Sequence, residues 1–461
     1  MPPLPPDLLA ALVAPGGGRV VLILGAGCSV EPPTSLRLSR EYAREAHHHL
    51  VADHILDQGQ CPNPDDLSSV ADSVWEATGS QEELIRRLPV AEFRNAAAND
   101  GYILAAALLR EHVIACVMTL NFDLAMSQAL ASVGAKGDVS TIGGPQDHGN
   151  LGLINLIYLH RNAHAPANDW ILRSTALQQL WQGAWEEAIT HRVVAAAVTV
   201  FAGLGSPAAV LIETTQRIRG MLGNAAAIYQ VDRVAAHQSA FFAALGLPAA
   251  AYIRTPWTQF MRELAQRVVV EHREELRAAC LILQESEGWE PEDVDQLCDR
   301  VLDLGLLGLG QLRARWLLSD MPYIPRYMSN VSHIADLMLV VRLIERRSTT
   351  SAKLGSDGVV EFWEGDRMRA SLLCVSGRGQ RRWGSLEAEV RRSEPYWRYK
   401  RRIRHVIVAG VHGARPQQIA PPEDLVREAT QDDLIGGDQK LQLSDVDDIR
   451  SGVITPADLF D

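Results

Sequence analysis

The segment from Arg19 to Leu24 is a continuous β-branched and apolar run that leads directly into Gly25-Ala26-Gly27, and this junction limits what the chain can fold into more than any other feature. A strand without polar alternation is typical of a parallel sheet that is buried on both faces. Glycines placed straight after such a strand permit a tight turn. The sequence therefore predicts a central parallel strand with a turn at its carboxyl end.

Strand-like and helix-like segments continue to alternate over residues 15–255. Further strands are predicted at residues 112–119, 153–159, 195–202 and 226–231. Helices are predicted at residues 36–51, 123–133, 175–191 and 208–221, with several short helices over residues 65–110 as a helical insertion. This alternation predicts a doubly wound, Rossmann-like α/β domain. Right-handed crossovers in such a sheet place ligands at the carboxyl ends of the strands.

The pattern changes after residue 255. Long apolar-periodic segments at residues 257–286, 291–318 and 331–346 predict a helical linker or regulatory region over residues 256–347. A polar linker follows, and residues 359–363 and 368–375 then look like paired strands. With a helix at 386–402, a strand at 405–409 and an acidic tail from residue 430, we expect a small α+β domain over residues 357–461 that senses a signal or binds a partner.

Composition narrows the classes of function. A formal net charge of −12 argues against a chain that coats nucleic acid as a whole. No apolar stretch is long enough to span a membrane, and the Pro/Gly-rich N-terminal residues lack the order of a signal peptide, so we expect a cytoplasmic protein. The six cysteines form no C-x-x-C pair, which predicts neither a zinc site nor a disulfide framework.

Four glycine-rich or polar segments each follow a predicted strand. They are Gly25 to Ser29, Thr119 to Asp123, Leu159-His160 and Gly203 to Ser206. Each has an ordinary explanation when taken alone: a glycine-rich turn is often only a turn, an asparagine caps helices, and a lone histidine is more often a satisfied core residue. The carboxyl ends of parallel strands share one edge of a sheet, however, so together they predict a single site there.

The order and composition of these segments resemble the sirtuin family, including its NAD-hydrolysing bacterial antiphage members. In that family a Gly-Ala-Gly-x-Ser loop, a Thr-x-Asn-x-Asp turn, a Leu-His-Gly strand end and a later Gly-x-Gly/Ser loop surround NAD. The resemblance covers residues 15–255. It implies a sirtuin-type domain with NAD as its substrate.

Carried over residue by residue, the resemblance also implies roles in the site. The residues that would hold the phosphates are Gly25, Ala26, Gly27 and Ser29, and those facing the adenosine side are Gly203, Gly205 and Ser206. Asn121 and Asp123 would lie beside the nicotinamide ribose, and His160 would be the general base. Asp232 stands where the family contacts the adenosine ribose.

This sequence departs from the family pattern in two places. Arg161 replaces the glycine that usually follows the histidine, which alters the channel that admits an acyl-lysine peptide. Deacylating sirtuins also carry a four-cysteine zinc module, and no pair of cysteines here could form half of one. We therefore expect no zinc, and an enzyme that hydrolyses NAD to nicotinamide and ADP-ribose rather than a protein deacylase.

The resemblance implies a regulated antiphage effector, with a phage protein, an ATPase or Argonaute-type partner, or homo-oligomerisation as the trigger. Residues 391–404 interleave basic and aromatic side chains, which fits either nucleic-acid binding or a solvated helix face whose aromatics pack inward. Two alternatives stay open for the whole chain. One is a sensor that binds NAD or ADP-ribose without turnover, and the other is a nucleic-acid-binding subunit of a defence complex.

Overall fold

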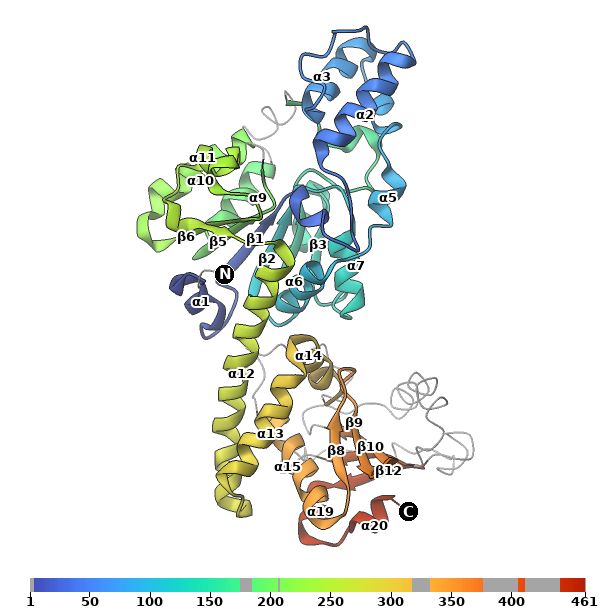
Figure 1. The fold of residues 1–461 in the computed structure, drawn as a ribbon, viewed down its shortest axis with the longest axis vertical. Helices are drawn as coiled ribbons and strands as arrows, with labels where there is room; N and C mark the ends of the chain where they lie inside the picture. Colours follow the sequence, from blue (N-terminus) through green and yellow to red (C-terminus); the bar gives the residue numbers. More distant parts are fainter. Residues whose placement is uncertain are drawn as a thin grey trace. The chain divides into compact units, whose positions relative to one another are not determined.

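The structure is a computed structural model that describes residues 4–174, 185–205, 208–316, 332–375, 405–410 and 440–460 (Figure 1). The chain divides into two compact units, Met1–Arg267 and Val268–Asp461. The boundary between them falls inside the long helix α12 (Trp257–Glu287). Residues 175–184 and 376–404 lie outside the described part, so most of the predicted helix at 175–191 and all of the basic and aromatic segment at 391–404 do too.

The first unit is built on a seven-stranded sheet in which every neighbouring pair is parallel. The strands lie in the order β3-β4-β2-β1-β5-β6-β7. Their bounds are β1 Val20–Leu24, β2 Ile114–Thr119, β3 Ser140–Ile142, β4 Asn155–Tyr158, β5 Val198–Ala202, β6 Ala227–Asp232 and β7 Tyr252–Arg254. The predicted doubly wound parallel sheet is confirmed.

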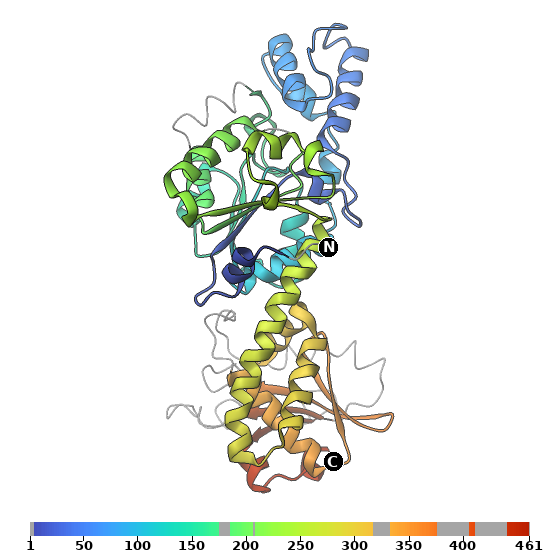
Figure 2. The same ribbon diagram turned by 60° about the vertical axis from the view of Figure 1, so that its left-hand side comes forward.

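Helices cover this sheet and form the predicted insertion. The α-helices are α1 Pro6–Val13, α2 Ser39–Ala52, α3 Leu67–Thr78, α4 Glu82–Ile85, α5 Val90–Arg94, α6 Asp100–Arg110, α7 Ala125–Ser132, α9 Trp185–Val194, α10 Ala209–Leu222 and α11 Ala240–Leu245. The 3-10 helices are η1 Ala26–Ser29, η2 Pro145–Asn150, η3 Ala167–Asp169, η4 Gly223–Ala225, η5 Ala236–Gln238 and η6 Ala249–Ala251. Helices α2, α3 and α5 belong to a lobe beyond the strands, whereas α9, α10 and α11 lie beside β5 and β6 (Figures 1 and 2).

The core explains why β1 is apolar throughout. Strand β1 lies in the middle of the sheet between β2 and β5, and all five of its residues are buried. Ile23 packs on one face with Met118 of β2 and Phe201 of β5. Because layers on both sides exclude water, a polar residue at any of these positions would lose hydration without gaining a partner. The central strand is thereby fixed, and with it the position of the turn at Gly25.

The two edge strands β3 and β7 were not predicted. Each is only three residues long, and β3 alternates partly buried, exposed and buried positions rather than showing a continuous apolar run. A segment this short carries too few residues to show a strand period. The edges of the sheet therefore depend on pairing with β4 and β6 more than on local sequence.

The second unit contains the helices α13 (Pro291–Asp303), α14 (Gly305–Trp316) and α15 (Ser332–Arg347) besides most of α12. The apolar-periodic segment at residues 291–318 contains two helices, α13 and α14, which are separated at Gly305, where the backbone is left-handed with φ of 62°. No helix within the described ranges is both long and apolar enough to cross a membrane.

A five-stranded mixed sheet completes this unit, in the order β12-β11-β10-β9-β8. Its strands are β8 Ser351–Leu354, β9 Val360–Glu364, β10 Arg367–Val375, β11 His405–Gly410 and β12 Lys440–Asp445, and two short helices follow, α19 Val446–Ser451 and α20 Pro456–Phe460. The predicted hairpin is confirmed, since β9 and β10 are antiparallel across Gly365 with φ of 58°. Strand β8 lies in the predicted polar linker, and β12, α19 and α20 lie in the predicted tail, so all four were missed from the sequence.

Candidate functional site

The topology of the sheet sets one position, beside β1, apart from the rest of its carboxyl edge. From β1 the chain moves outward through β2 to the edge strand β3, comes back to β4, and then crosses to the other side of β1 to form β5. Strand order thus reverses at β1, and doubly wound sheets bind ligands outside the carboxyl ends of the strands at such a point. The four segments predicted to form the site follow β1, β2, β4 and β5, all at this edge.

The glycine loops after β1 and β5 pack directly against each other. The Gly25 amide donates to the Ala202 carbonyl at 2.9 Å, and the Gly27 amide donates to the Gly203 carbonyl at 2.9 Å. A Cβ atom on Gly27 would lie 2.7 Å from the Gly203 Cα, and one on Gly203 would lie 2.5 Å from the Cys28 amide nitrogen. The packing of the two loops therefore requires glycine at these positions. We call the two joined loops the glycine support.

Gly205, by contrast, has free space around it. A Cβ atom there would meet no heavy atom within 4 Å, and the backbone is not in the left-handed region. Its carbonyl accepts a hydrogen bond from the Phe241 amide at 3.3 Å, which ties the loop to α11. Ser206, predicted together with Gly203 and Gly205, lies outside the described residues.

Four side chains from distant parts of the chain form a buried hydrogen-bond network, which we call the polar cluster: Ser29, Tyr102, Asn121 and Asp123. Ser29 Oγ donates to Asp123 Oδ2 at 2.8 Å and lies 2.8 Å from the Tyr102 hydroxyl. Asn121 Nδ2 lies 3.0 Å from the Gly25 carbonyl oxygen, 3.2 Å from Ser29 Oγ and 3.4 Å from the Tyr102 hydroxyl. All four side chains are at most 8% exposed.

Local backbone contacts hold the turn that carries Asn121 and Asp123. The Asn121 amide donates to Thr119 Oγ1 at 3.0 Å, and Asp123 Oδ1 accepts from the Ala125 amide at 3.0 Å, where α7 begins. An Asx-type side chain that accepts from an amide two residues later stabilises this kind of turn. Asn121 therefore does not cap α7, whose N-cap position is Leu124, and its side-chain amide faces the Gly25 carbonyl instead.

Tyr102 reaches the polar cluster from α6, and Asn99 fixes that helix. Asn99 is fully buried; its Oδ1 accepts from the Tyr102 amide at 3.1 Å, and its Nδ2 donates to the Cys28 carbonyl at 2.9 Å. One side chain therefore caps α6 and holds the loop after β1 at the same time. Sequence reasoning missed both residues, although Asn99 before an apolar helical run is a recognisable capping signal.

Burial controls the charges in the polar cluster. It raises the pKa of Asp123, and the hydrogen bonds from Ser29 and the Ala125 amide oppose that rise. Burial and then the charge of Asp123 hold the pKa of Tyr102 well above its usual value, so the phenol stays neutral. Burial also raises the pKa of the Cys28 thiol, which makes it a packing residue rather than a nucleophile.

His160 lies at the neighbouring strand end. Strand β4 pairs with β2, and the Leu159 amide donates to the Thr119 carbonyl at 3.0 Å, so His160 follows beside the Asn121 turn. The residue is partly exposed, yet desolvation, followed by the charge of Arg161, lowers its pKa to about 4. Among the residues that the structure describes, none joins its imidazole to the polar cluster. The structure thus brings Ser29, Asn121 and Asp123 together and places His160, whose pKa burial lowers to about 4, at the neighbouring strand end.

Arg161 adopts the backbone conformation that glycine favours, with φ of 75°. Its guanidinium lies 3.1 Å from Glu186 Oε1, and the Glu186 side chain is only 2% exposed. The same guanidinium lies 5.6 Å from the ring centroid of Trp185. At this position, therefore, the chain accepts a strained arginine whose charge is neutralised by a buried carboxylate.

Asp232 is at the end of β6, two strands from β1. Its Oδ1 accepts from the Val234 amide at 3.3 Å, and it makes no hydrogen bond with the polar cluster. Its negative charge contributes to the raised pKa of the Cys28 thiol after burial and Glu31, so it acts on the loop after β1 through space. A role beside the adenosine ribose stays a prediction.

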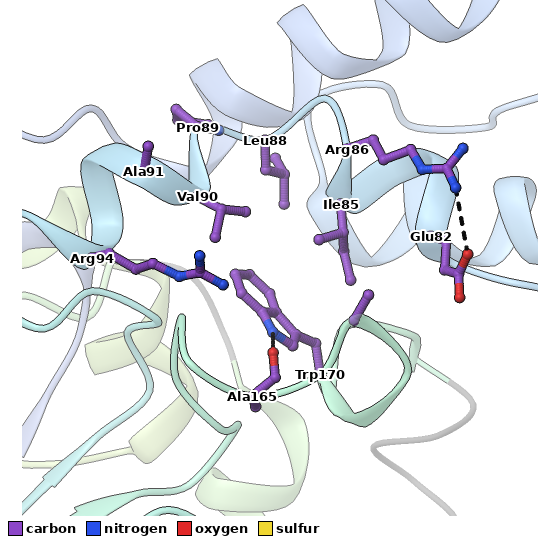
Figure 3. Close-up of a pocket in the computed structure, with 11 residues that line it drawn as sticks. Glu82, Ile85, Arg86, Leu88, Pro89, Val90, Ala91, Arg94, Ala165 and Trp170 are labelled. Carbon is purple, nitrogen blue, oxygen red and sulfur yellow. Dashed lines mark hydrogen bonds and ion pairs between the residues drawn. The ribbon is translucent and has the colours of Figure 1, made fainter.

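A separate cavity of about 490 Å³ lies in the helical insertion (Figure 3). It is lined by Glu82, Ile85, Arg86, Leu88, Pro89, Val90, Ala91, Arg94, Ala165, Ala167 and Trp170. None of these residues was predicted to belong to the site. The cavity is formed by segments more than 70 residues apart, which leaves no local sequence pattern that could have found it.

The five cysteines with described side chains are buried, and within the described residues no group of three or more His, Cys, Asp or Glu side chains is placed to hold a metal ion. No protein-family model matches the sequence. No curated protein matches it either.

Among solved structures, similar chains include a Sir2 homologue mutant in complex with ADP-ribose (18% identity, TM-score 0.33), covering 57% of this chain and 96% of that one. Another is a Sir2 mutant with a p53 peptide and NAD (14% identity, TM-score 0.33; 57% and 98% covered). A third is a Sir2 homologue in complex with NAD (17% identity, TM-score 0.30; 57% and 93% covered). At these identities and TM-scores the likeness assigns neither a function nor a family to this chain.

Proposed function

We propose that the first unit binds NAD at the carboxyl edge of its sheet and hydrolyses it to nicotinamide and ADP-ribose. The observation that carries this proposal is the polar cluster of Ser29, Tyr102, Asn121 and Asp123, which lies at the reversal of strand order beside the glycine loops. Nucleotides bind at this place in doubly wound folds. The motif resemblance described above assigns three of these residues, Ser29, Asn121 and Asp123, to the NAD site.

The orientation of the Asn121 amide supports a role in the reaction. The Gly25 carbonyl can only accept, so the amide nitrogen of Asn121 must face it, at 3.0 Å. The carboxamide oxygen then points away from that carbonyl, and no residue in the described ranges donates to it. Asn121 Oδ1 is therefore available to accept a hydrogen bond from a ribose hydroxyl or from the attacking water.

Hydrolysis of the nicotinamide–ribose bond transfers the bonding electron pair to the ring nitrogen and develops positive charge on the ribose. Water then bonds to the anomeric carbon and releases a proton. A neutral imidazole at the adjacent strand end can accept that proton, and the low pKa of His160 keeps it unprotonated at neutral pH. Asp123 supplies a nearby carboxylate, held by Ser29, that favours the developing cation.

The Arg161–Glu186 pair supports hydrolysis over transfer to an acyl-lysine peptide. Here a charged side chain with a buried partner stands beside His160, where the resemblance has a glycine. Since free NAD hydrolysis would harm a host cell, we further propose a regulated antiphage effector in which the second unit senses a trigger or docks a partner.

A single assay tests the proposal. Purified chain is incubated with NAD, alone and with lysate of infected cells, and nicotinamide is followed by chromatography. Asn121→Ala and His160→Ala are each expected to lower the rate at least about 100-fold. Matched controls are Asn150→Ala and His164→Ala, which alter exposed residues of the same types. If the catalytic variants release nicotinamide as fast as the wild type does, the assignment is wrong.

A second candidate is a sensor that binds NAD or ADP-ribose without turnover. It is favoured by one observation: the His160 imidazole is not hydrogen-bonded to the polar cluster in the described part of the chain. A sensor would show ligand-dependent thermal stabilisation without nicotinamide release. The same preparation distinguishes the two candidates when both readouts are recorded.

A further inference from the structure

The cavity in the helical insertion has the features of a ligand site. It lies between α4, α5 and residues 165–170, and its volume of about 490 Å³ is within the range of small-molecule pockets. We propose that it binds a small organic anion with a flat, apolar body. This site is separate from the polar cluster, and the inference does not depend on NAD chemistry.

The walls account for the flat, apolar part of the ligand. Ile85, Leu88 and Val90 present aliphatic side chains toward the indole of Trp170, as Figure 3 shows. The indole is fixed on both sides: its Nε1 donates to the Ala165 carbonyl at 3.1 Å, and its ring stacks on Phe122 at 4.4 Å with an interplanar angle of 11°. A rigid aromatic wall opposite aliphatic groups favours a planar ring.

Arg94 accounts for the negative charge of the ligand. Its Nε donates to the Ala163 carbonyl at 2.7 Å, which holds the guanidinium at the edge of the cavity near Trp170 (Figure 3). No carboxylate in the described residues pairs with it. The other cation, Arg86, is already paired with Glu83 at 2.7 Å and with Glu82 at 3.8 Å. Among the described side chains, Arg94 is thus the cation of the cavity whose charge no carboxylate balances, and it lies next to the apolar wall.

The cavity also shares its wall with the turn that carries two residues of the polar cluster. Phe122, which stacks on Trp170, stands between Asn121 and Asp123. The Ala163 amide donates to the Phe122 carbonyl at 2.8 Å, and the Ala163 carbonyl accepts from Arg94. A ligand on Trp170 and Arg94 therefore contacts groups that are bonded to the back of this turn, which gives it a direct route to influence the cluster.

The test compares two dyes of the same shape on the full chain. The probes are 8-anilinonaphthalene-1-sulfonate, which has a flat naphthalene ring and an anionic sulfonate, and N-phenyl-1-naphthylamine, which lacks the sulfonate. Fluorescence titration is expected to show one sulfonate site that binds at least about 10-fold more tightly than the neutral dye, as a charge-assisted hydrogen bond implies. Arg94→Gln should reduce this preference to about 2-fold or less, whereas Arg86→Gln should leave it within about 2-fold of wild type.

A second variant tests the cavity without changing its charge. Ala91 lines the rim and is exposed, so Ala91→Phe fills the space from outside and is expected to weaken both dyes at least about 10-fold. The thermal unfolding midpoint of each variant is measured as the control for retention of the fold. The inference is overturned if Arg94→Gln keeps the preference for the anion, or if Ala91→Phe binds both dyes as wild type does.

Discussion

Replacing Arg161 with glycine has two opposite effects on the free energy of unfolding, and the two differ in size. The left-handed conformation at φ of 75° costs a non-glycine residue about 1–2 kcal/mol, and glycine removes that strain. Glycine also has more conformational freedom in the unfolded chain, which lowers this stabilisation by about 0.5–1 kcal/mol. From the backbone alone, the variant would therefore be stabilised by about 0–1.5 kcal/mol.

The lost ion pair reverses the sign. Glu186 is 2% exposed and the Arg161 side chain is 12% exposed, so the variant leaves a buried carboxylate without its cation. Breaking such a pair from one side costs about 3–5 kcal/mol. The net expectation for Arg161→Gly is a loss of about 1.5–5 kcal/mol in the free energy of unfolding, on the same basis. The double variant Arg161→Gly/Glu186→Gln removes the uncompensated charge and should recover most of this loss.

Equilibrium unfolding in urea, followed by fluorescence and circular dichroism on the full chain, measures both variants. The transition that includes the first unit should move to lower urea for Arg161→Gly and return toward wild type for the double variant. An Arg161→Gly chain that is more stable than wild type would show that backbone strain outweighs the ion pair. A double variant as unstable as the single one would show that the Glu186 charge is not the cause.

The remaining predictions concern the glycine support, the phenol and pH. Gly203→Ala should lower the free energy of unfolding by about 2 kcal/mol or more, because the new Cβ would lie 2.5 Å from the Cys28 amide nitrogen. The matched variant Gly205→Ala should change it by less than about 0.5 kcal/mol, because a Cβ there meets no heavy atom within 4 Å. Thermal unfolding of both variants measures the difference. Tyr102→Phe should cost about 1–2 kcal/mol in urea unfolding, since Ser29 and Asn121 lose a buried partner, and an unchanged midpoint would contradict the network. Folding lowers the pKa of His160 to about 4. As the pH decreases, the unfolded chain therefore takes up the proton on this histidine before the folded chain does. The free energy of unfolding should decrease between pH 6.5 and pH 4 by at most about 3 kcal/mol. His160→Gln should reduce that slope, and a slope that stays the same would mean that the imidazole is not desolvated.

The sheet was predictable because its long strands are central. Strand β1 is buried on both faces, so all of its consecutive residues are apolar, and this pattern is visible in the sequence. The positions of the four functional segments followed from the rule that parallel strands share a carboxyl edge, which is why Ser29, Asn121 and Asp123 could be expected near one another although they are up to 94 residues apart.

Other features depend on contacts that no local pattern records. Tyr102 appears in the sequence as one apolar position of a helix, and only the packing of α6 brings its hydroxyl to Ser29, 73 residues away. The departure at Arg161 was visible, but its left-handed backbone and its buried partner Glu186 were not. The Trp170 cavity likewise arises from the contact of two segments whose separate sequences are ordinary.

Calorimetric titration of NAD into the full chain tests the central claim most directly. The account predicts saturable binding to the wild type that ADP-ribose competes away, with at least about 10-fold weaker binding to Ser29→Ala and Asn121→Ala, because each removes a polar partner from the polar cluster. The exposed control His164→Ala should bind NAD as the wild type does. Absence of NAD binding by a folded wild-type chain, or equal binding by all four proteins, would contradict the account.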